Sequence, residues 1–140
     1  MDENGHPVEC FGAILSDEIM AEFLAESSHP ISELEILPVL VALRLWWSKI
    51  LGAPVVSNLD NDSARSVLTR GDRSTKVARA MVLQFLELEK KLRISPWASR
   101  VPRFSNPADD ASRPSFNVTW LLGVPRNHVV LPAQLRQWGM

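Results

Sequence analysis

Val55-Val56-Ser57-Asn58-Leu59, followed directly by Asp60-Asn61-Asp62, is the stretch that decides the fold class. Residues 55–59 are a short run with three apolar side chains, and a break at 52–54 precedes them, so the pattern predicts a strand. This strand ends in a cluster of carboxylates. Because the elements predicted on both sides of it are helices, the chain is expected to have an α/β fold.

Two helices and a second strand are predicted after this point. A short helix is expected over residues 64–70, with Asp62 or Ser63 as its N-cap. A longer helix is expected over residues 75–92, because its apolar side chains repeat with a period of about 3.6 residues. Residues 94–101 contain a proline and are therefore expected to form an edge strand.

A largely buried helix is predicted over residues 32–50, because apolar side chains cover most of its circumference. Ser32 and Glu35 have the spacing of a capping box at its start. Pro38 should either kink this helix or mark a later start. Before the helix, residues 9–15 and 20–25 are short apolar runs separated by polar residues, and they are expected to form a β-hairpin.

The composition fits one globular domain. The chain has 140 residues, of which 46% are hydrophobic, and a formal net charge of −1, so it can bury a core. The single Cys10 cannot form an internal disulfide, and residues 1–20 contain no Lys or Arg and do not fit a signal peptide. We expect a soluble intracellular protein, in the cytoplasm or nucleus, without a membrane span. Trp46, Trp47 and Trp97 are expected in the core.

Three carboxylates lie beside predicted elements, namely Glu35, Asp60 and Asp109. Each has an ordinary interpretation: Glu35 as a capping-box partner, Asp60 as a turn former, and Asp109 or Asp110 as a helix N-cap. Taken together they have a second interpretation. Carboxylates drawn from a helix, a strand end and a later segment are the oxygen ligands that a pair of Mg²⁺ ions needs.

Four stretches of the chain, in this order, resemble the ribonuclease H domain of retroelement reverse transcriptases. They are residues 11–15 (FGAIL), 35–43 (EILPVLVAL), 59–65 (LDNDSAR), and 100–102 (RVP) with 105–113 (SNPADDASR). The resemblance implies a ribonuclease H-like domain over residues 1–113, with a mixed sheet flanked by helices, and a C-terminal tail over 114–140. It also implies hydrolysis of the RNA strand of an RNA/DNA hybrid with Mg²⁺, or Mn²⁺, as cofactor. The implied partners are the hybrid and the rest of a reverse-transcriptase polyprotein.

The resemblance also implies roles for individual residues. Glu35, Asp60 and Asp109 match the family's catalytic, metal-binding carboxylates, and Asp110 replaces Asp109 if the register is shifted by one. Asn61 lies beside the site. A group of cations follows the strand end: Arg65, Arg70, Arg73, Lys76 and Arg79. These side chains could contact hybrid phosphates, and they could equally be the solvated faces of two helices.

The chain departs from the family at its first strand. In the family this strand carries the first catalytic aspartate and lies in the middle of the sheet. Here only eleven residues precede Gly12, and residues 1–5 contain no apolar run. We therefore expect an N-terminally truncated or decayed domain with impaired catalysis. The alternatives are a non-catalytic structural or interaction remnant of a retroelement polyprotein, and a partial domain that receives the absent strand from another segment.

Overall fold

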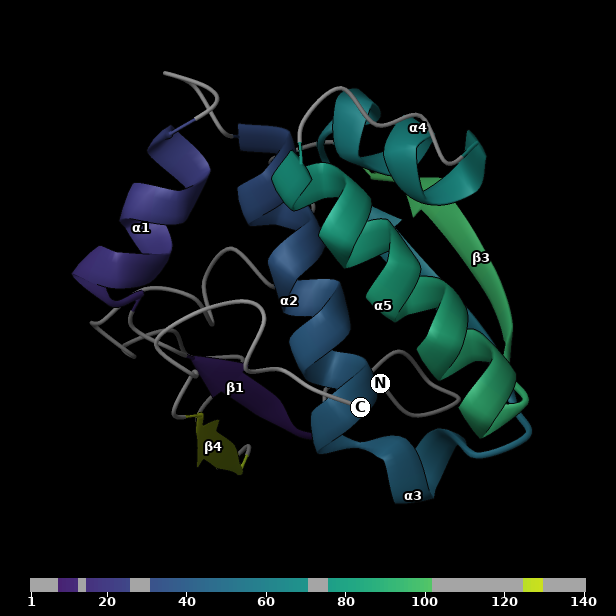
Figure 1. Cartoon of the computed structure of the whole chain (residues 1–140). Helices are drawn as coiled ribbons and strands as arrows, with labels where there is room; N and C mark the ends of the chain where they lie inside the picture. Colours follow the sequence, from purple (N-terminus) through teal and green to yellow (C-terminus); the bar gives the residue numbers. More distant parts are fainter. Residues whose placement is uncertain (1–7, 13–14, 26–30, 71–75, 102–124, 130–140) are drawn as a thin grey trace.

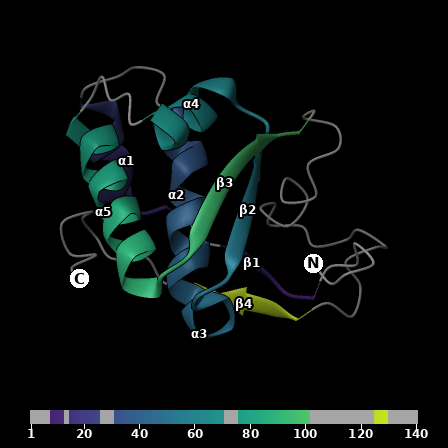
Figure 2. The ribbon, with the colours of Figure 1, turned by 90° about the vertical axis from the view of Figure 1, so that its right-hand side faces the viewer.

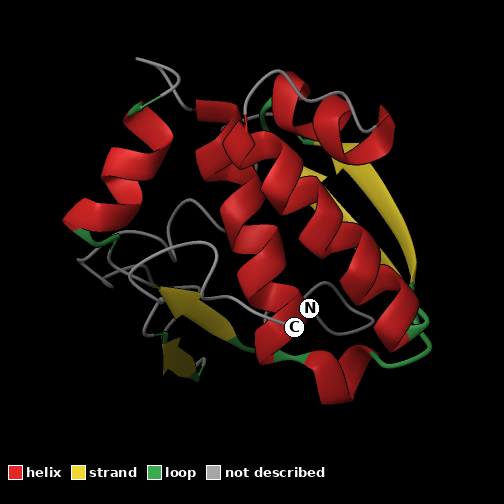
Figure 3. Ribbon diagram, in the orientation of Figure 1, coloured by secondary structure: helices red, strands yellow, loops and turns green. Residues whose placement is uncertain are grey.

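The structure is a computed structural model, and it describes residues 8–12, 15–25, 31–70, 76–101 and 125–129. This part of the chain is mixed α/β (Figures 1 and 3). In chain order its elements are β1 (Cys10–Gly12), α1 (Asp17–Leu24), α2 (Ile31–Leu45), α3 (Trp47–Ile50), β2 (Pro54–Leu59), α4 (Asp62–Arg70), α5 (Lys76–Leu92), β3 (Ser95–Arg100) and β4 (Arg126–His128).

The described strands form two separate parallel pairs. β2 pairs with β3 from Pro54↔Ser95 to Leu59↔Arg100, and β1 pairs with β4. Helices α2 and α5 cover one face of the β2–β3 pair (Figure 2). The opposite face carries Val56 and Trp97, which are 60% and 70% exposed. The predicted strand over 55–59 and the predicted second strand are confirmed.

The core lies between α1, α2, α5 and the inner face of β2–β3. Its most completely buried large side chains are Ile19, Phe23, Ile36, Leu40 and Met81. Most of the circumference of α2 is buried, as the sequence predicts. The predicted helix over 75–92 is confirmed as α5, which contributes seven buried residues to the interior.

The predicted hairpin is wrong, because residues 20–25 belong to α1 and to its C-terminal end. The Ser16 side chain accepts a hydrogen bond from the Ile19 N–H at 3.2 Å and caps this helix. Two acidic residues occupy its first turn, where the helix dipole favours negative charge. A Ser-Asp-Glu sequence suits a helix start as well as a turn, and the four-residue spacing of buried Ile19 and Phe23 favours the helix.

The predicted helix over 32–50 is divided into α2 and α3 at Trp46. Helix α2 begins at Ile31 and continues through Pro38, so the Ser32 backbone lies within the first turn and not at the position before the helix that a capping box requires. Pro38 is exposed, and it does not delay the start of the helix. Trp47 is 54% exposed. The expectation that Trp47 and Trp97 lie in the core is therefore wrong, because Trp47 lies on an exposed part of the short helix α3 and Trp97 on the outer face of β3.

The β1–β4 pair is attached to the end of α2 through Glu9. The Glu9 carboxylate accepts hydrogen bonds from Trp46 Nε1 at 2.8 Å and from Asn127 Nδ2 at 2.9 Å, and it forms an ion pair with Lys49. The Phe11 ring meets the Trp46 ring edge to face, with centroids 5.6 Å apart. Through these contacts and its pairing with β1, strand β4, which lies within the predicted tail, packs against the N-terminal end of the described chain.

Candidate functional site

Glu35 and Asp60 lie at the same end of the described structure. The opposite end is formed by the loops 51–53 and 92–94, where the Gly52 N–H donates to the Leu92 carbonyl at 2.8 Å. Helix α2 runs towards that end and β2 runs away from it, so the start of α2 and the end of β2 are together (Figure 1). Glu35 lies near the start of α2, Asp60 directly follows β2, and both are half-buried.

Asn61 has a structural contact in the loop after Asp60. Its side-chain oxygen accepts a hydrogen bond from the Ala64 N–H at 2.8 Å, and its carbonyl accepts one from the Arg65 N–H at 3.1 Å. Asn61 is therefore the N-cap of α4, and the prediction that Asp62 or Ser63 caps this helix is wrong. Asn is as good a cap as Asp or Ser, so propensity alone could not separate the three.

Asp62 is oriented by a residue that sequence reasoning did not place in the site. Its carboxylate lies 3.0 Å from Arg100 Nε at the end of β3. Both side chains are more than half exposed, so this ion pair contributes at most about 1 kcal/mol. It connects the first turn of α4 to β3 and places Asp62 beside a cation.

Glu33 is a carboxylate at this end that sequence reasoning missed. Its side chain is only 7% exposed, although it lies in the first turn of α2. The signal was available, because Glu33 precedes the buried Ile36 and Leu37 by three and four residues and so lies on the apolar stripe of the helix. The N-terminal end of a helix stabilises such a negative charge.

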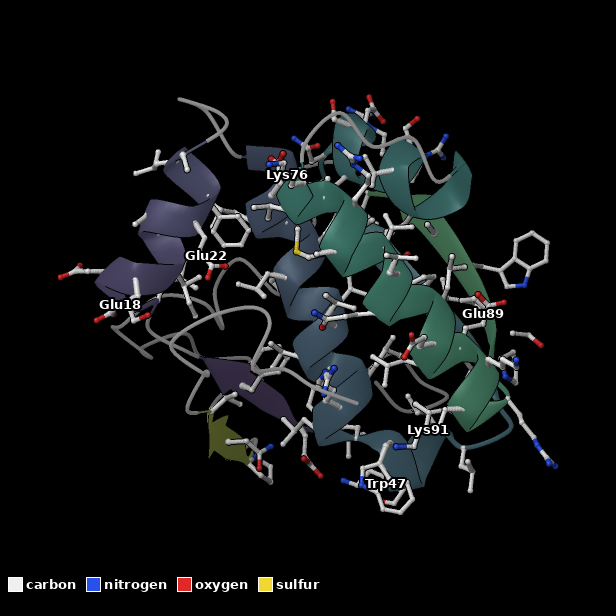
Figure 4. The ribbon with its side chains drawn as sticks, viewed as in Figure 1. Glu18, Glu22, Trp47, Lys76, Glu89 and Lys91 are labelled. Carbon is white, nitrogen blue, oxygen red and sulfur yellow. The ribbon has the colours of Figure 1, made fainter. Side chains whose placement is uncertain are left out.

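The described cations of the predicted group are exposed. Arg65 on α4, and Lys76 and Arg79 on α5, are in contact with solvent. Figure 4 shows Lys76 at the start of α5, the end of the molecule where α2 begins. Arg73 and the side chain of Arg70 lie outside the described residues. Exposure is compatible with phosphate contacts and with solvated helix faces, so both interpretations stand.

The described residues do not make a metal site by themselves. No group of three His, Cys, Asp or Glu side chains suited to a metal ion is found within these ranges. The third predicted ligand, Asp109, and its alternative Asp110 lie outside them. The structure therefore brings Glu35 and Asp60 to one end, and the third predicted ligand lies outside the described residues.

The described helices are too short or too polar to cross a membrane. Comparison of the chain with protein-family models, with curated proteins and with solved structures found no match.

Proposed function

We propose that this chain is a ribonuclease H-like domain of a retroelement reverse transcriptase, which hydrolyses the RNA strand of an RNA/DNA hybrid. The observation that carries the proposal is the position of Asp60 at the carboxyl end of β2, at the same end as Glu35 on α2. Ligand sites of open α/β sheets lie outside the carboxyl ends of their strands. The motif order around these two residues supports the same assignment.

Glu35, Asp60 and Asp109 would hold Mg²⁺, or Mn²⁺, which also prefers oxygen ligands. Such ions, when bound, activate water for attack on a phosphodiester. Arg65 and Lys76 would contact the hybrid phosphates, together with Arg70, Arg73 and the side chain of Asn61. The partners would be the hybrid and the rest of a reverse-transcriptase polyprotein, in the cytoplasm or nucleus.

A second function is favoured by the composition of β1. This strand, Cys10-Phe11-Gly12, carries no carboxylate, and it pairs with β4 instead of β2. The aspartate that the family places on its first strand is therefore not supplied by β1. This supports impaired catalysis and, as the alternative, a non-catalytic interaction remnant that still binds nucleic acid.

The test is cleavage of a labelled RNA/DNA hybrid by the purified chain with Mg²⁺. The variants Glu35→Gln and Asp60→Asn each remove the negative charge of a proposed ligand with little change in shape. Asp62→Asn, in the first turn of α4, makes the same chemical change at a neighbouring position and is the matched control. Cleavage that is lost in the first two variants and retained in the control supports the enzyme. Hybrid binding without cleavage supports the remnant, and the absence of both rejects the proposal.

A further inference from the structure

The β2–β3 pair has one face covered by helices and one face open to solvent (Figure 2). Side chains of a strand alternate between the two faces of a sheet. Val55, Leu59 and Ala98 lie on the covered face, where they belong to the core or pack against it. The side chains of the opposite face, which we call the outer face, are all exposed: Pro54, Val56, Asn58, Ser95, Trp97 and Ser99.

Trp97 lies at the centre of the outer face. Its side chain is 70% exposed, more than that of any other large hydrophobic residue that the structure describes. Val56 is its direct partner across the strand pair, and Ser95 and Ser99 lie on the same face, about 7 Å to either side along β3. A rigid aromatic ring left in water at the middle of a sheet face is a flat surface on which another ring can stack.

The outer face offers hydrogen-bonding groups but no charge. Its polar side chains are the Asn58 amide and the hydroxyls of Ser95 and Ser99, and each of them can donate and accept hydrogen bonds. An unpaired nucleobase has a flat ring for stacking, and it carries donors and acceptors along its edge. The outer face is complementary to both features, and it presents no carboxylate that would repel the phosphates attached to such a base.

Cations lie at both ends of β3. Arg93 precedes the strand and Arg100 is its last residue, and both are exposed. No acidic residue occurs between them in the chain. Seven residue steps of extended chain span at most about 25 Å. Both guanidinium groups are therefore within a few nucleotides of a base that stacks on Trp97, and each can attract a phosphate.

Acidic residues partly offset these cations, so stacking should contribute more to the affinity than charge does. Asp62 forms an ion pair with Arg100 Nε, which leaves the Arg100 side chain 55% exposed. At the Arg93 end, the last turn of α5 carries two exposed lysines and the half-buried Glu89. Binding to this face should therefore depend strongly on the base and only weakly on the salt concentration.

We propose that the outer face of β2–β3 binds a single-stranded nucleic acid, with one base stacked on Trp97 and flanking phosphates near Arg93 and Arg100. Stacking of a base on an aromatic side chain needs no particular sequence, because every base has a flat face. A duplex fits less well, since its bases already stack on one another. The outer face is turned away from α2, which carries Glu35, so the inference does not depend on the proposed nuclease function.

Fluorescence anisotropy of a dye-labelled oligodeoxythymidylate, measured without Mg²⁺, tests the contact. Trp97→Ala is expected to raise the dissociation constant by about tenfold, and Trp97→Phe, which keeps a ring, should raise it less. Trp47→Ala is the matched control, because it removes an exposed tryptophan from α3, and it should leave the dissociation constant unchanged. Far-UV circular dichroism must show unchanged helix content in all three variants.

A probe without bases separates stacking from charge. An abasic oligomer of the same length carries the same phosphates but no rings. The wild-type chain is expected to bind it about tenfold more weakly than the oligodeoxythymidylate, and Trp97→Ala should cause no further loss. For the base-bearing oligomer, the slope of log affinity against log salt should be no steeper than about −1.4, the value for two phosphate contacts of a single strand.

Other outcomes overturn the proposal. Equal effects of Trp97→Ala and Trp47→Ala, or equal binding of the abasic and base-bearing oligomers, would show that no base stacks on the outer face. A much steeper salt slope would assign the binding to cations on another surface, and the absence of binding at all accessible concentrations contradicts the proposal as well. Cleavage of a blunt-ended hybrid is measured separately, so failure of the nuclease proposal and failure of this one are distinguishable.

Discussion

Asn127 donates a hydrogen bond from its side-chain amide to the Glu9 carboxylate, at 2.9 Å and across 118 positions of sequence. The same carboxylate accepts from Trp46 Nε1 at the junction of α2 and α3. One side chain therefore holds together β4, the start of β1 and the end of the central helix. Glu9 is half-buried, so the loss of this acceptor is not compensated fully by water.

Glu9→Gln is expected to destabilise the fold by about 1 to 3 kcal/mol, because it removes the charge that three donors share. The measurement is the free energy of unfolding from urea titration followed by tryptophan fluorescence. Glu87→Gln changes the same chemical group at an exposed position of α5 and should stay within about 0.5 kcal/mol of wild type. Equal effects of the two substitutions would show that Glu9 does not join these segments.

Arg44 and Gln84 connect α2 to α5. The Arg44 guanidinium donates to the Gln84 side-chain oxygen at 3.3 Å, and burial lowers the pKa of Arg44 from its ordinary value. Gln84→Leu removes this acceptor while the charge stays between the helices, and it should cost about 1 to 2 kcal/mol.

The double variant Arg44→Met/Gln84→Leu should recover much of that cost, because no charge is left to desolvate. A double-mutant cycle of unfolding free energies measures the coupling between the two side chains. Strictly additive effects would mean that the hydrogen bond does not contribute.

Two substitutions distinguish the observed N-cap of α4, which is Asn61, from the predicted N-caps. Asn61→Ala removes the acceptor of the Ala64 N–H and should destabilise the chain by about 1 kcal/mol. Ser63→Ala lies inside the helix and should be close to neutral or slightly stabilising. Thermal unfolding of the two variants decides the question, and a larger loss for Ser63→Ala would restore the predicted cap.

If Lys76 contacts a phosphate of the hybrid, the affinity for the hybrid should decrease as the salt concentration rises. Lys76→Gln should reduce the slope of log affinity against log salt by up to about one unit, as expected for the loss of one phosphate contact. Lys91→Gln removes the same charge at the opposite end of α5 and should leave the slope unchanged. Binding isotherms at several salt concentrations provide the measurement. Equal slopes in both variants would assign Lys76 to a solvated helix face.

The sequence alone did not determine the roles of the residues that cap helices or form turns. The polar residues 16–18 fit a hairpin turn and a helix start equally well, and the burial of Ile19 and Phe23, four residues apart, selected the helix. The cap of α4 was ambiguous for the same reason, since Asn61, Asp62 and Ser63 are all good N-caps. The burial of Glu33 could have been predicted from its spacing to Leu37 on the apolar stripe of α2.

The amino-acid sequence by itself determined the elements whose pattern is local: the period of α5, the apolar circumference of α2, and the β2 strand with Asp60 at its end. Each of these depends on side chains that are neighbours along the chain, so propensity and periodicity are sufficient. Only the tertiary structure decided the pairing of β1 with β4, the meeting of Glu9 with Asn127, and the position of Glu35 at the same end as Asp60. These relations join residues far apart in sequence, and the burial of the shared core selects them.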